Sequence, residues 1–178
     1  MNKPITLTDA NRLTSDFFNR DVLVVAPELI NKLLVRKYED GTIAQYRITE
    51  TEAYRGEEDL ACHASKGRTP RTSVMYESGG KIYMYLIYGM YQMLNFVTSG
   101  ENIPQAVLIR GIEGFNGPGK LTRHLQLDKS FYGENLSGSN RLWVENDGIL
   151  PVYSTGKRIG IDYAGEWKDK PWRFFLFL

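Results

Sequence analysis

Two glutamates on one predicted strand have the residue type and spacing to do chemistry. Side chains alternate across a strand, so one face of residues 44–54 carries apolar residues that lead directly into Glu50 and Glu52. The other face is polar, and we expect it to be exposed to water. An ionised carboxylate that faces a core is costly unless it is paired, hydrogen-bonded or used, and burial raises its pKa toward the range of a general base. The same pattern is compatible with a strand that ends there and a glutamate that only pairs with an arginine.

Tyrosines gather in the segment that follows. Five of the chain's 11 tyrosines lie between positions 76 and 91. Alternation puts Tyr83 and Tyr85 on one face of a strand, and Gly89 allows a turn after Tyr88, so Tyr88 is predicted at a hairpin tip. Turns usually prefer Asn or Asp. The rings could hold a nucleobase while one of them enters a duplex, or they could be ordinary strand aromatics packed against a helix.

Other motifs do not develop into sites. Gly114, Gly119 and Lys120 have the spacing of a phosphate-binding loop, but Leu121 stands where a Ser or Thr would contact magnesium, so we exclude nucleotide triphosphate binding. The adjacent Cys62 and His63 cannot chelate one ion in ordinary geometry. With one cysteine and two histidines in the chain, we expect neither a metal site nor a cofactor.

The elements that must position these residues are predicted to be helices first and strands afterwards. We expect helices over residues 9–19 and 28–34, with Pro27 at the start of the second, and a hairpin that turns at Asp40 and Gly41. Further strands are predicted over residues 81–87, 91–98, 106–112, 156–161 and 172–178, and a helix from Pro118 to position 127. This order predicts an α+β fold: a mainly antiparallel, curved sheet with surrounding helices and a protruding hairpin, in a single domain over residues 1–178.

Composition limits the classes of partner. The 42% hydrophobic and 24% charged residues are typical of a globular protein rather than a disordered one. No apolar run reaches the ~18 residues of a membrane span, and the first residues hold no signal core, so we expect a cytoplasmic protein, nucleoid-associated if it is bacterial. A net charge of +1 means that nucleic acid would have to be held by local patches. Residues 63–81, 116–129 and 157–178 lean positive.

Several motifs, in order along the chain, resemble those of the alkyladenine DNA glycosylase family, whose members are also called 3-methyladenine or methylpurine DNA glycosylases. The motifs are ETEAY at 50–54, GEEDLACH at 56–63, TPR at 69–71, YLIYGMYQMLN at 85–95, AVLIRGIE at 106–113, NGPGKL at 116–121 and AGEWKDKPWRF at 164–174. The resemblance covers roughly residues 21–177. The loop after His63 differs in detail, which leaves the base preference open.

The resemblance implies a catalytic group of three residues. Glu52 matches the general base that activates a water molecule. Arg110 matches the arginine that helps to hold this water, and Ile159 matches the position whose main-chain carbonyl completes the water's surroundings.

The resemblance also implies a base pocket and a wedge. Tyr54 and Tyr85 match two aromatic walls that sandwich the extruded base, and His63 matches the residue beside them. Asn95 matches the residue that obstructs the amino group of normal guanine. Tyr88 matches the tyrosine that enters the minor groove and fills the vacated stack.

The function implied is that of a monofunctional DNA glycosylase in base excision repair. It would flip out 3-methyladenine, 7-methylguanine, hypoxanthine or ethenoadenine and hydrolyse the N-glycosidic bond with water, without metal or cofactor. Its partner would be double-stranded DNA that contains a damaged purine, and we expect a monomer. A non-catalytic module that binds damaged bases is the alternative. A sugar glycosidase is disfavoured, because Glu50 and Glu52 share one side of a strand whereas glycosidase carboxylates flank the bond.

Overall fold

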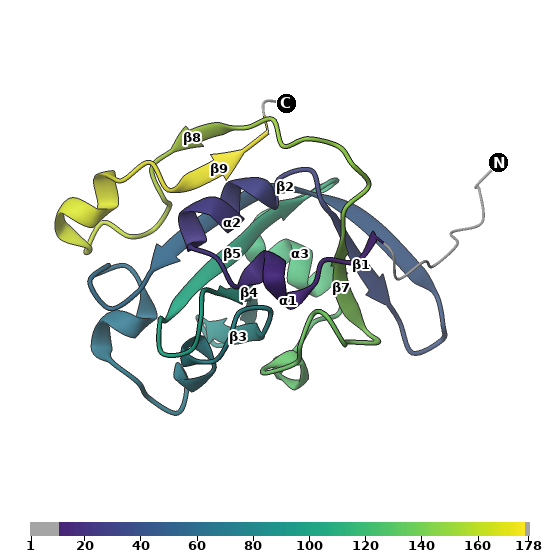
Figure 1. Cartoon of the computed structure of the whole chain (residues 1–178), viewed down its shortest axis with the longest axis horizontal. Coiled ribbons are helices and arrows are strands. Elements are labelled where there is room, and N and C mark those ends of the chain that lie inside the picture. Colours follow the sequence, from purple (N-terminus) through teal and green to yellow (C-terminus); the bar gives the residue numbers. More distant parts are fainter. Residues whose placement is uncertain (1–10, 177–178) are drawn as a thin grey trace.

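A computed structural model describes residues 11–176 of the chain (Figure 1). Its centre is an antiparallel sheet with the strand order β3-β4-β5-β2-β1-β7. These strands span β1 (Leu33–Lys37), β2 (Ile43–Arg55), β3 (Ile82–Ile87), β4 (Tyr91–Thr98), β5 (Gln105–Ile112) and β7 (Leu142–Glu145). The short β6 (Phe115–Asn116) pairs with β5, and β8 (Ser154–Gly156) pairs with β9 (Arg173–Phe175), which joins β2. The sheet is curled, so the predicted α+β class and curved antiparallel sheet are confirmed.

In the described part of the chain, three α-helices pack against the long central strands of the sheet. In Figure 1, α1 (Ser15–Phe18) and α2 (Val22–Glu28) lie in front of the strands, and α2 packs on β2 and β5. The third helix, α3 (Pro118–His124), packs against β4, β5 and β6. The main core lies between these helices and the strands, with Val22 and Val25 of α2 and Leu121 of α3 among its fully buried members. Four short 3₁₀ helices complete the described chain: η2 (His63–Lys66), η3 (Ser73–Tyr76), η4 (Lys129–Phe131) and η5 (Gly165–Asp169).

The predicted helix over residues 28–34 is wrong. The helix instead begins one residue after Asp21, whose carboxylate accepts a hydrogen bond from the N–H of Leu23 at 2.9 Å and caps it. Pro27 therefore lies in the last turn rather than the first, and Leu33 already opens β1. Of the helix predicted over residues 9–19, only the turn of α1 forms within the described residues, and positions 9 and 10 lie outside them.

Strand β2 does not keep one simple alternation. Its pairing with β5 shifts register on both sides of Glu50. Thr51 and Ala53, expected on the exposed face, are buried: the hydroxyl of Thr51 donates to the carbonyl of Ala26 in α2 at 2.9 Å. Glu52 is buried as well. The strand is therefore covered on both faces where it carries the two glutamates.

The remaining elements follow the predictions unevenly. The β1–β2 hairpin, β3, β4 and β5 form where they are predicted. Helix α3 begins at Pro118 as predicted but ends at His124, before the predicted end at position 127. The strand predicted over residues 156–161 is wrong beyond Gly156, because the chain then leaves the sheet to form a loop beside the site. The last predicted strand is confirmed for Arg173–Phe175, and positions 177 and 178 lie outside the described residues. Strands β6 and β7 are not among the predictions.

Candidate active site

A cavity of about 430 Å³ opens between β3–β5, the η2 segment and the loop after β8. The predicted site residues that line it are Tyr54, His63, Tyr85, Tyr88, Asn95, Arg110 and Ile159. They come from four strands, one hairpin turn, the 3₁₀ helix η2 and one loop, so only the folded chain brings them together. Glu52 does not line the cavity. It lies behind the wall, in contact with three residues that do.

The Glu52 carboxylate is enclosed by hydrogen-bond donors. Its side chain exposes 0% of its surface. The N–H of Ile159 donates to Oε1 at 2.7 Å, and the hydroxyl of Tyr54 donates to Oε2 at 2.7 Å. The Nε of Arg110 lies 3.5 Å from Oε1. Each carboxylate oxygen has two acceptor positions, so the group can still accept a further donor.

Burial raises the pKa of Glu52 above its ordinary value. The positive charge of Arg110 and the hydrogen bonds from Ile159 and Tyr54 act in the opposite direction. A buried carboxylate of this kind binds a proton more readily than an exposed carboxylate does, which is a property that a general base requires.

Glu50 has a different environment from Glu52, two positions along β2. The Nε of Arg110 is 3.1 Å from Oε1 of Glu50, and the Nε of Arg173 in β9 is 2.6 Å from the same oxygen. Glu50 therefore pairs with two arginines and fixes Arg110 between the two glutamates. The expectation that one glutamate only forms ion pairs describes Glu50. Glu52 has a single and longer ion pair, at 3.5 Å from Arg110.

Ile159 contacts the carboxylate through its N–H. The resemblance implied a role for its carbonyl, and the contact seen in the structure is that of the amide nitrogen. Gly160 follows with a positive φ of 75°, a conformation that glycine adopts without strain and that turns the loop along the cavity wall.

Aromatic side chains form the walls of the cavity. The rings of His63 and Tyr85 meet edge to face with centroids 4.5 Å apart, and Nδ1 of His63 lies 2.8 Å from the hydroxyl of Tyr83. Burial, with smaller contributions from Arg71 and Lys66, lowers the pKa of His63 to about 4, so the imidazole is neutral at pH 7. Burial raises the pKa of both Tyr54 and Tyr85, so both remain uncharged phenols.

Asn95 is fixed at the back of the cavity. It is 3% exposed, and its amide nitrogen donates to the carbonyls of Tyr83 and Met93, each at 3.2 Å. Tyr83 lies on the neighbouring strand β3. The two bonds hold the side chain in one orientation against the cavity.

Tyr88 occupies the tip of the β3–β4 hairpin, as predicted. It is 83% exposed, and Leu86 and Met90 beside it are also exposed. Its φ of 52° places it in the left-handed region, as does that of Gly89 at 68°. A bulky residue in this region is strained by roughly 1–2 kcal/mol. The tip therefore presents an aromatic ring to solvent in a conformation that favours Gly or Asn.

The described residues contain no group of three or more His, Cys, Asp or Glu side chains that could hold a metal ion. Within the same part of the chain, no helix is long and apolar enough to cross a membrane.

Comparison with known proteins agrees with these motifs. The sequence model of the family described as methylpurine-DNA glycosylase matches residues 16–115 and 113–177. The chain belongs to the methylpurine-DNA glycosylase family. It is 44% identical to a protein of Psychrobacter cryohalolentis over 86% of each chain, and 45% identical to one of Desulfitobacterium hafniense over 93% of this chain and 95% of that one. A protein of Rickettsia felis is 45% identical over 92% of each chain. All three carry the name "Putative 3-methyladenine DNA glycosylase". The chain is therefore a DNA glycosylase, which is a class of DNA-repair enzyme.

Two features of this methylpurine-DNA glycosylase site lie beyond the sequence predictions. Arg173 supports Glu50 from β9, a contact that requires the C-terminal strand to pair with β2. Asp59 and Arg158 form a buried ion pair behind Tyr54. Arg158, immediately before the predicted Ile159, is a possible signal for this pair in the sequence. Its partner Asp59 lies 99 positions away, and no spacing pattern connects the two residues.

Proposed function

We propose that this chain removes damaged purines from double-stranded DNA by hydrolysing the N-glycosidic bond. The observation that carries the proposal is the buried Glu52 carboxylate, held by Tyr54, Arg110 and Ile159 directly behind an aromatic-walled cavity. A carboxylate placed next to a slot for a flat ring supports catalysis on the bond that joins the ring to its sugar.

The first step is extrusion of the nucleotide from the duplex. Flipping costs a few kcal/mol and costs least for a damaged or mispaired base. Tyr88, exposed and strained at the hairpin tip, is suited to fill the vacated stack. Tyr54 and Tyr85 then stack on the base, which contributes roughly 1–3 kcal/mol per base in single-strand binders. Alkylated purines such as 3-methyladenine and 7-methylguanine carry positive charge, and aromatic faces attract them more than they attract neutral bases.

The second step is attack by water on the anomeric carbon. The ionised Glu52 takes a proton from water as the new C–O bond forms and the C–N bond breaks, and the bonding electrons leave with the purine. The transition state resembles an oxocarbenium ion, which the negative charge of Glu52 stabilises. The attacking water is placed on the side of Arg110, because Arg110 lines the cavity and its Nε lies 3.5 Å from Oε1 of Glu52, whereas Tyr54 and Ile159 already donate at 2.7 Å. The products are a free base and an abasic site.

The enzyme is proposed to be monofunctional. Among the described residues that line the cavity there is no lysine, the side chain that would form a Schiff base with the sugar. Borohydride added during the reaction should therefore trap no protein–DNA adduct. A covalent adduct on a duplex with a single lesion would contradict this part of the proposal.

Substrate choice is proposed to depend on Asn95 and on the charge of the base. Asn95 lines the cavity and is held by two hydrogen bonds, which supports the proposal that its amide obstructs the extra amino group of guanine. Hypoxanthine lacks this group and ethenoadenine is neutral, so both should enter the cavity, with less attraction to the rings than 3-methyladenine has. One chain supplies every residue of the site, which supports action as a monomer in a single domain over residues 1–178.

The decisive assay uses duplexes that hold one hypoxanthine or ethenoadenine, followed by alkali to cut abasic sites, and methylated DNA from which released bases are separated by chromatography. We expect release of 3-methyladenine and cleavage of at least one oligonucleotide. A protein that bound the damaged duplex but released no base would instead be a binding module, and the hydrolytic proposal would be wrong.

A further inference from the structure

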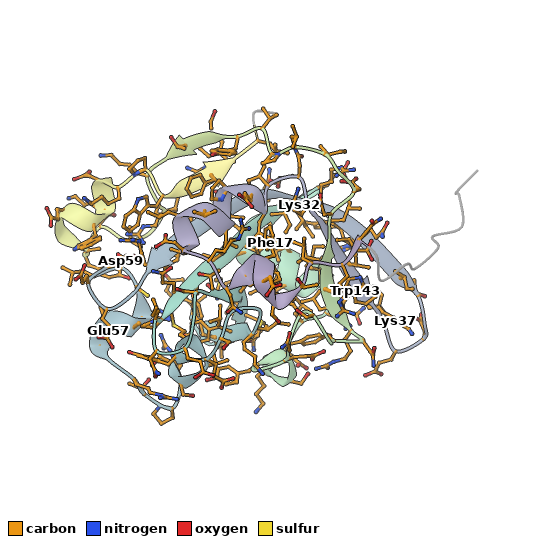
Figure 2. The ribbon with its side chains drawn as sticks, in the orientation of Figure 1. Phe17, Lys32, Lys37, Glu57, Asp59 and Trp143 are labelled. Atoms are coloured by element: carbon orange, nitrogen blue, oxygen red, sulfur yellow. The ribbon has the colours of Figure 1, made fainter. Side chains whose placement is uncertain are left out.

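A fully buried ion pair lies next to the candidate site. Nη1 of Arg158 donates to Oδ2 of Asp59 at 2.6 Å, and Nη2 donates to Oδ1 at 2.9 Å. Neither side chain has any exposed surface. Asp59 lies where the segment after β2 meets the C-terminal segment that contains η5 (Figure 2). The pair therefore joins two distant parts of the chain with bidentate geometry.

Asp59 organises the turn that follows β2. Its carboxylate accepts hydrogen bonds from the N–H groups of Arg55 and Ala61, each at 3.0 Å. Its own carbonyl accepts from the N–H of Cys62 at 2.8 Å. This turn leads directly to His63, so Asp59 ties the cavity wall to Arg158.

Arg158 contacts the surroundings of Glu52 from three directions. It immediately precedes Ile159, whose N–H donates to Oε1 of Glu52. Nη1 also donates to the carbonyl of Ala53, the residue between Glu52 and Tyr54, at 2.9 Å. The guanidinium carbon lies 4.8 Å from the centre of the Tyr54 ring, whose hydroxyl donates to Oε2.

Stability alone is a poor explanation for this arrangement. Buried ion pairs can often be replaced by apolar residues without loss of stability, because removing two charges from water is costly. The Nε of Arg158 is also buried without a hydrogen-bond partner among the described residues, which is a further cost. Arg158 also donates to the carbonyl of Trp167 and lies over the ring of Trp172. Its contacts with Ala53 and the Tyr54 ring, and its place next to Ile159, connect the pair to the two donors of Glu52.

We propose that Asp59 and Arg158 are positioning residues that hold the N–H of Ile159 and the hydroxyl of Tyr54 against the two oxygens of Glu52. Neither residue touches the substrate. The ion pair fixes the loop that carries Ile159 and the ring that carries the Tyr54 hydroxyl, so both donors stay in place when water and DNA compete for the carboxylate. The inference rests on the proposed function, because it takes Glu52 as the reacting group.

Among the described residues, Tyr54 is the titratable neighbour of Glu52 that contacts Arg158. Glu50 shares the strand of Glu52, Arg110 faces it from β5, and Tyr85 interacts with it from β3. Arg173 reaches only Glu50. Changes at Arg158 should therefore act on Glu52 through Ile159 and Tyr54.

The test is a direct titration of the Glu52 carboxyl carbon by NMR in the whole protein, with the signal assigned by Glu52→Gln. Arg158→Lys keeps the charge but loses the planar fork and the contact with the Tyr54 ring. Weakening one charge-assisted hydrogen bond should raise the titration midpoint by about one pH unit. The matched control is Arg141→Lys, since Arg141 pairs with Glu134 outside the cavity. It should leave the midpoint unchanged.

A second measurement needs no variant. In the unaltered protein, the amide proton of Ile159 should titrate with the same midpoint as the Glu52 carboxyl, because the bond between them changes strength on protonation. A folded Arg158→Lys protein with the wild-type midpoint, or an Ile159 amide that ignores the titration of Glu52, would overturn the inference. If Arg158→Lys does not fold, the Ile159 amide titration and the Glu52 midpoint of the double variant Asp59→Asn/Arg158→Gln replace it. A raised midpoint in the double variant supports the inference, and a wild-type midpoint contradicts it.

The titration does not depend on catalysis, so it separates this inference from the proposed function. If the unaltered protein released no base, the proposed function would fail while the midpoints still tested the positioning of Glu52. If base release were normal and Arg158→Lys left the midpoint unchanged, only the positioning role would fail.

Discussion

Replacing Glu52 by glutamine should abolish most base release and also stabilise the protein at neutral pH. The amide keeps the size of the side chain and can still accept from the N–H of Ile159, but it cannot take a proton from water or bear negative charge. Loss of a general base costs about 10²–10⁴-fold in rate. Loss of the charge that faces the developing oxocarbenium ion adds to this, since a single electrostatic contact of this kind contributes about 10²–10³-fold. The loss should be smaller for 3-methyladenine than for hypoxanthine, because a cationic purine leaves more readily.

The stability effect has the opposite sign. Burial raises the pKa of Glu52 in the folded state above the ordinary value of 4.5. The folded state therefore favours the protonated group, whose contribution to stability is fully present below that value and is lost as pH rises through the folded pKa. Glutamine resembles the protonated form at every pH. The difference in free energy of unfolding should be near zero at pH 4 and should favour Glu52→Gln at pH 8.

Single-turnover excision from a duplex with one lesion measures the rate, and denaturant unfolding at several pH values measures the stability. The control is Glu145→Gln: Glu145 accepts from Trp143 at 2.7 Å and from Gln45 at 3.1 Å, and it does not line the cavity. It should keep normal excision. Excision by Glu52→Gln within tenfold of the wild type would refute the catalytic role, and a variant less stable than the wild type at pH 8 would refute the electrostatic reasoning.

Three further predictions concern the cavity and the tip. Tyr88→Ser should slow base flipping or make it less complete in stopped-flow fluorescence, whereas Tyr88→Phe, which keeps the ring, should not; equal flipping by both would remove the wedge role. Tyr54→Phe deletes one hydrogen bond to a charged group, worth about 1.5–3 kcal/mol, so the acid limb of the excision profile should move up by about one to two pH units, and an unmoved limb would contradict this. Because the pKa of His63 is lowered to about 4 while an unfolded histidine titrates near 6.5, stability should fall as pH decreases from 6.5 to 4. His63→Gln should lose this part of the pH dependence, as measured by unfolding, and an identical pH dependence in both proteins would argue against a neutral imidazole.

Local patterns were sufficient where one strand or turn decides the structure. The turn at Asp40 and Gly41 forms as predicted, because Gly41 takes a positive φ of 84° and the Asp40 carboxylate accepts from the N–H of Thr42. The same holds for the β3–β4 hairpin and for Tyr88 at its tip. In these places neighbouring residues contain most of the information, and tertiary contacts only add to it.

Tertiary burial overrides local preference at the N-terminal helix. Val22 and Val25 are β-branched and lower helix propensity, so residues 22–26 do not look helical in isolation. They form α2 because Asp21 caps it and because both valines are fully buried in the core. Pro27 favoured a helix start by its residue type, and no local signal indicated that it would end one.

In the candidate site, too, some features could be predicted from local sequence and others depend on tertiary contacts. The position of Glu52 on a strand beside aromatic residues could be predicted, and family motifs supplied Arg110 and Ile159. The register shifts on both sides of Glu50 could not be predicted, because they depend on pairing with β5. The difference between the two glutamates likewise comes from Arg173, which reaches Glu50 only after β9 joins β2.

The exposed hairpin tip has a consequence for how a lesion would be located. Leu86, Tyr88 and Met90 are open to solvent while the protein is alone, so the free energy gained by burying them is available at the first encounter with DNA. With Tyr88 as the proposed wedge, the tip would probe the stacking of each base step before any base reached the cavity. Weakly stacked steps would admit the ring, and well-stacked steps would exclude it. Searching would then depend on the local softness of the double helix, and chemical identity would be examined only at the sites that yield.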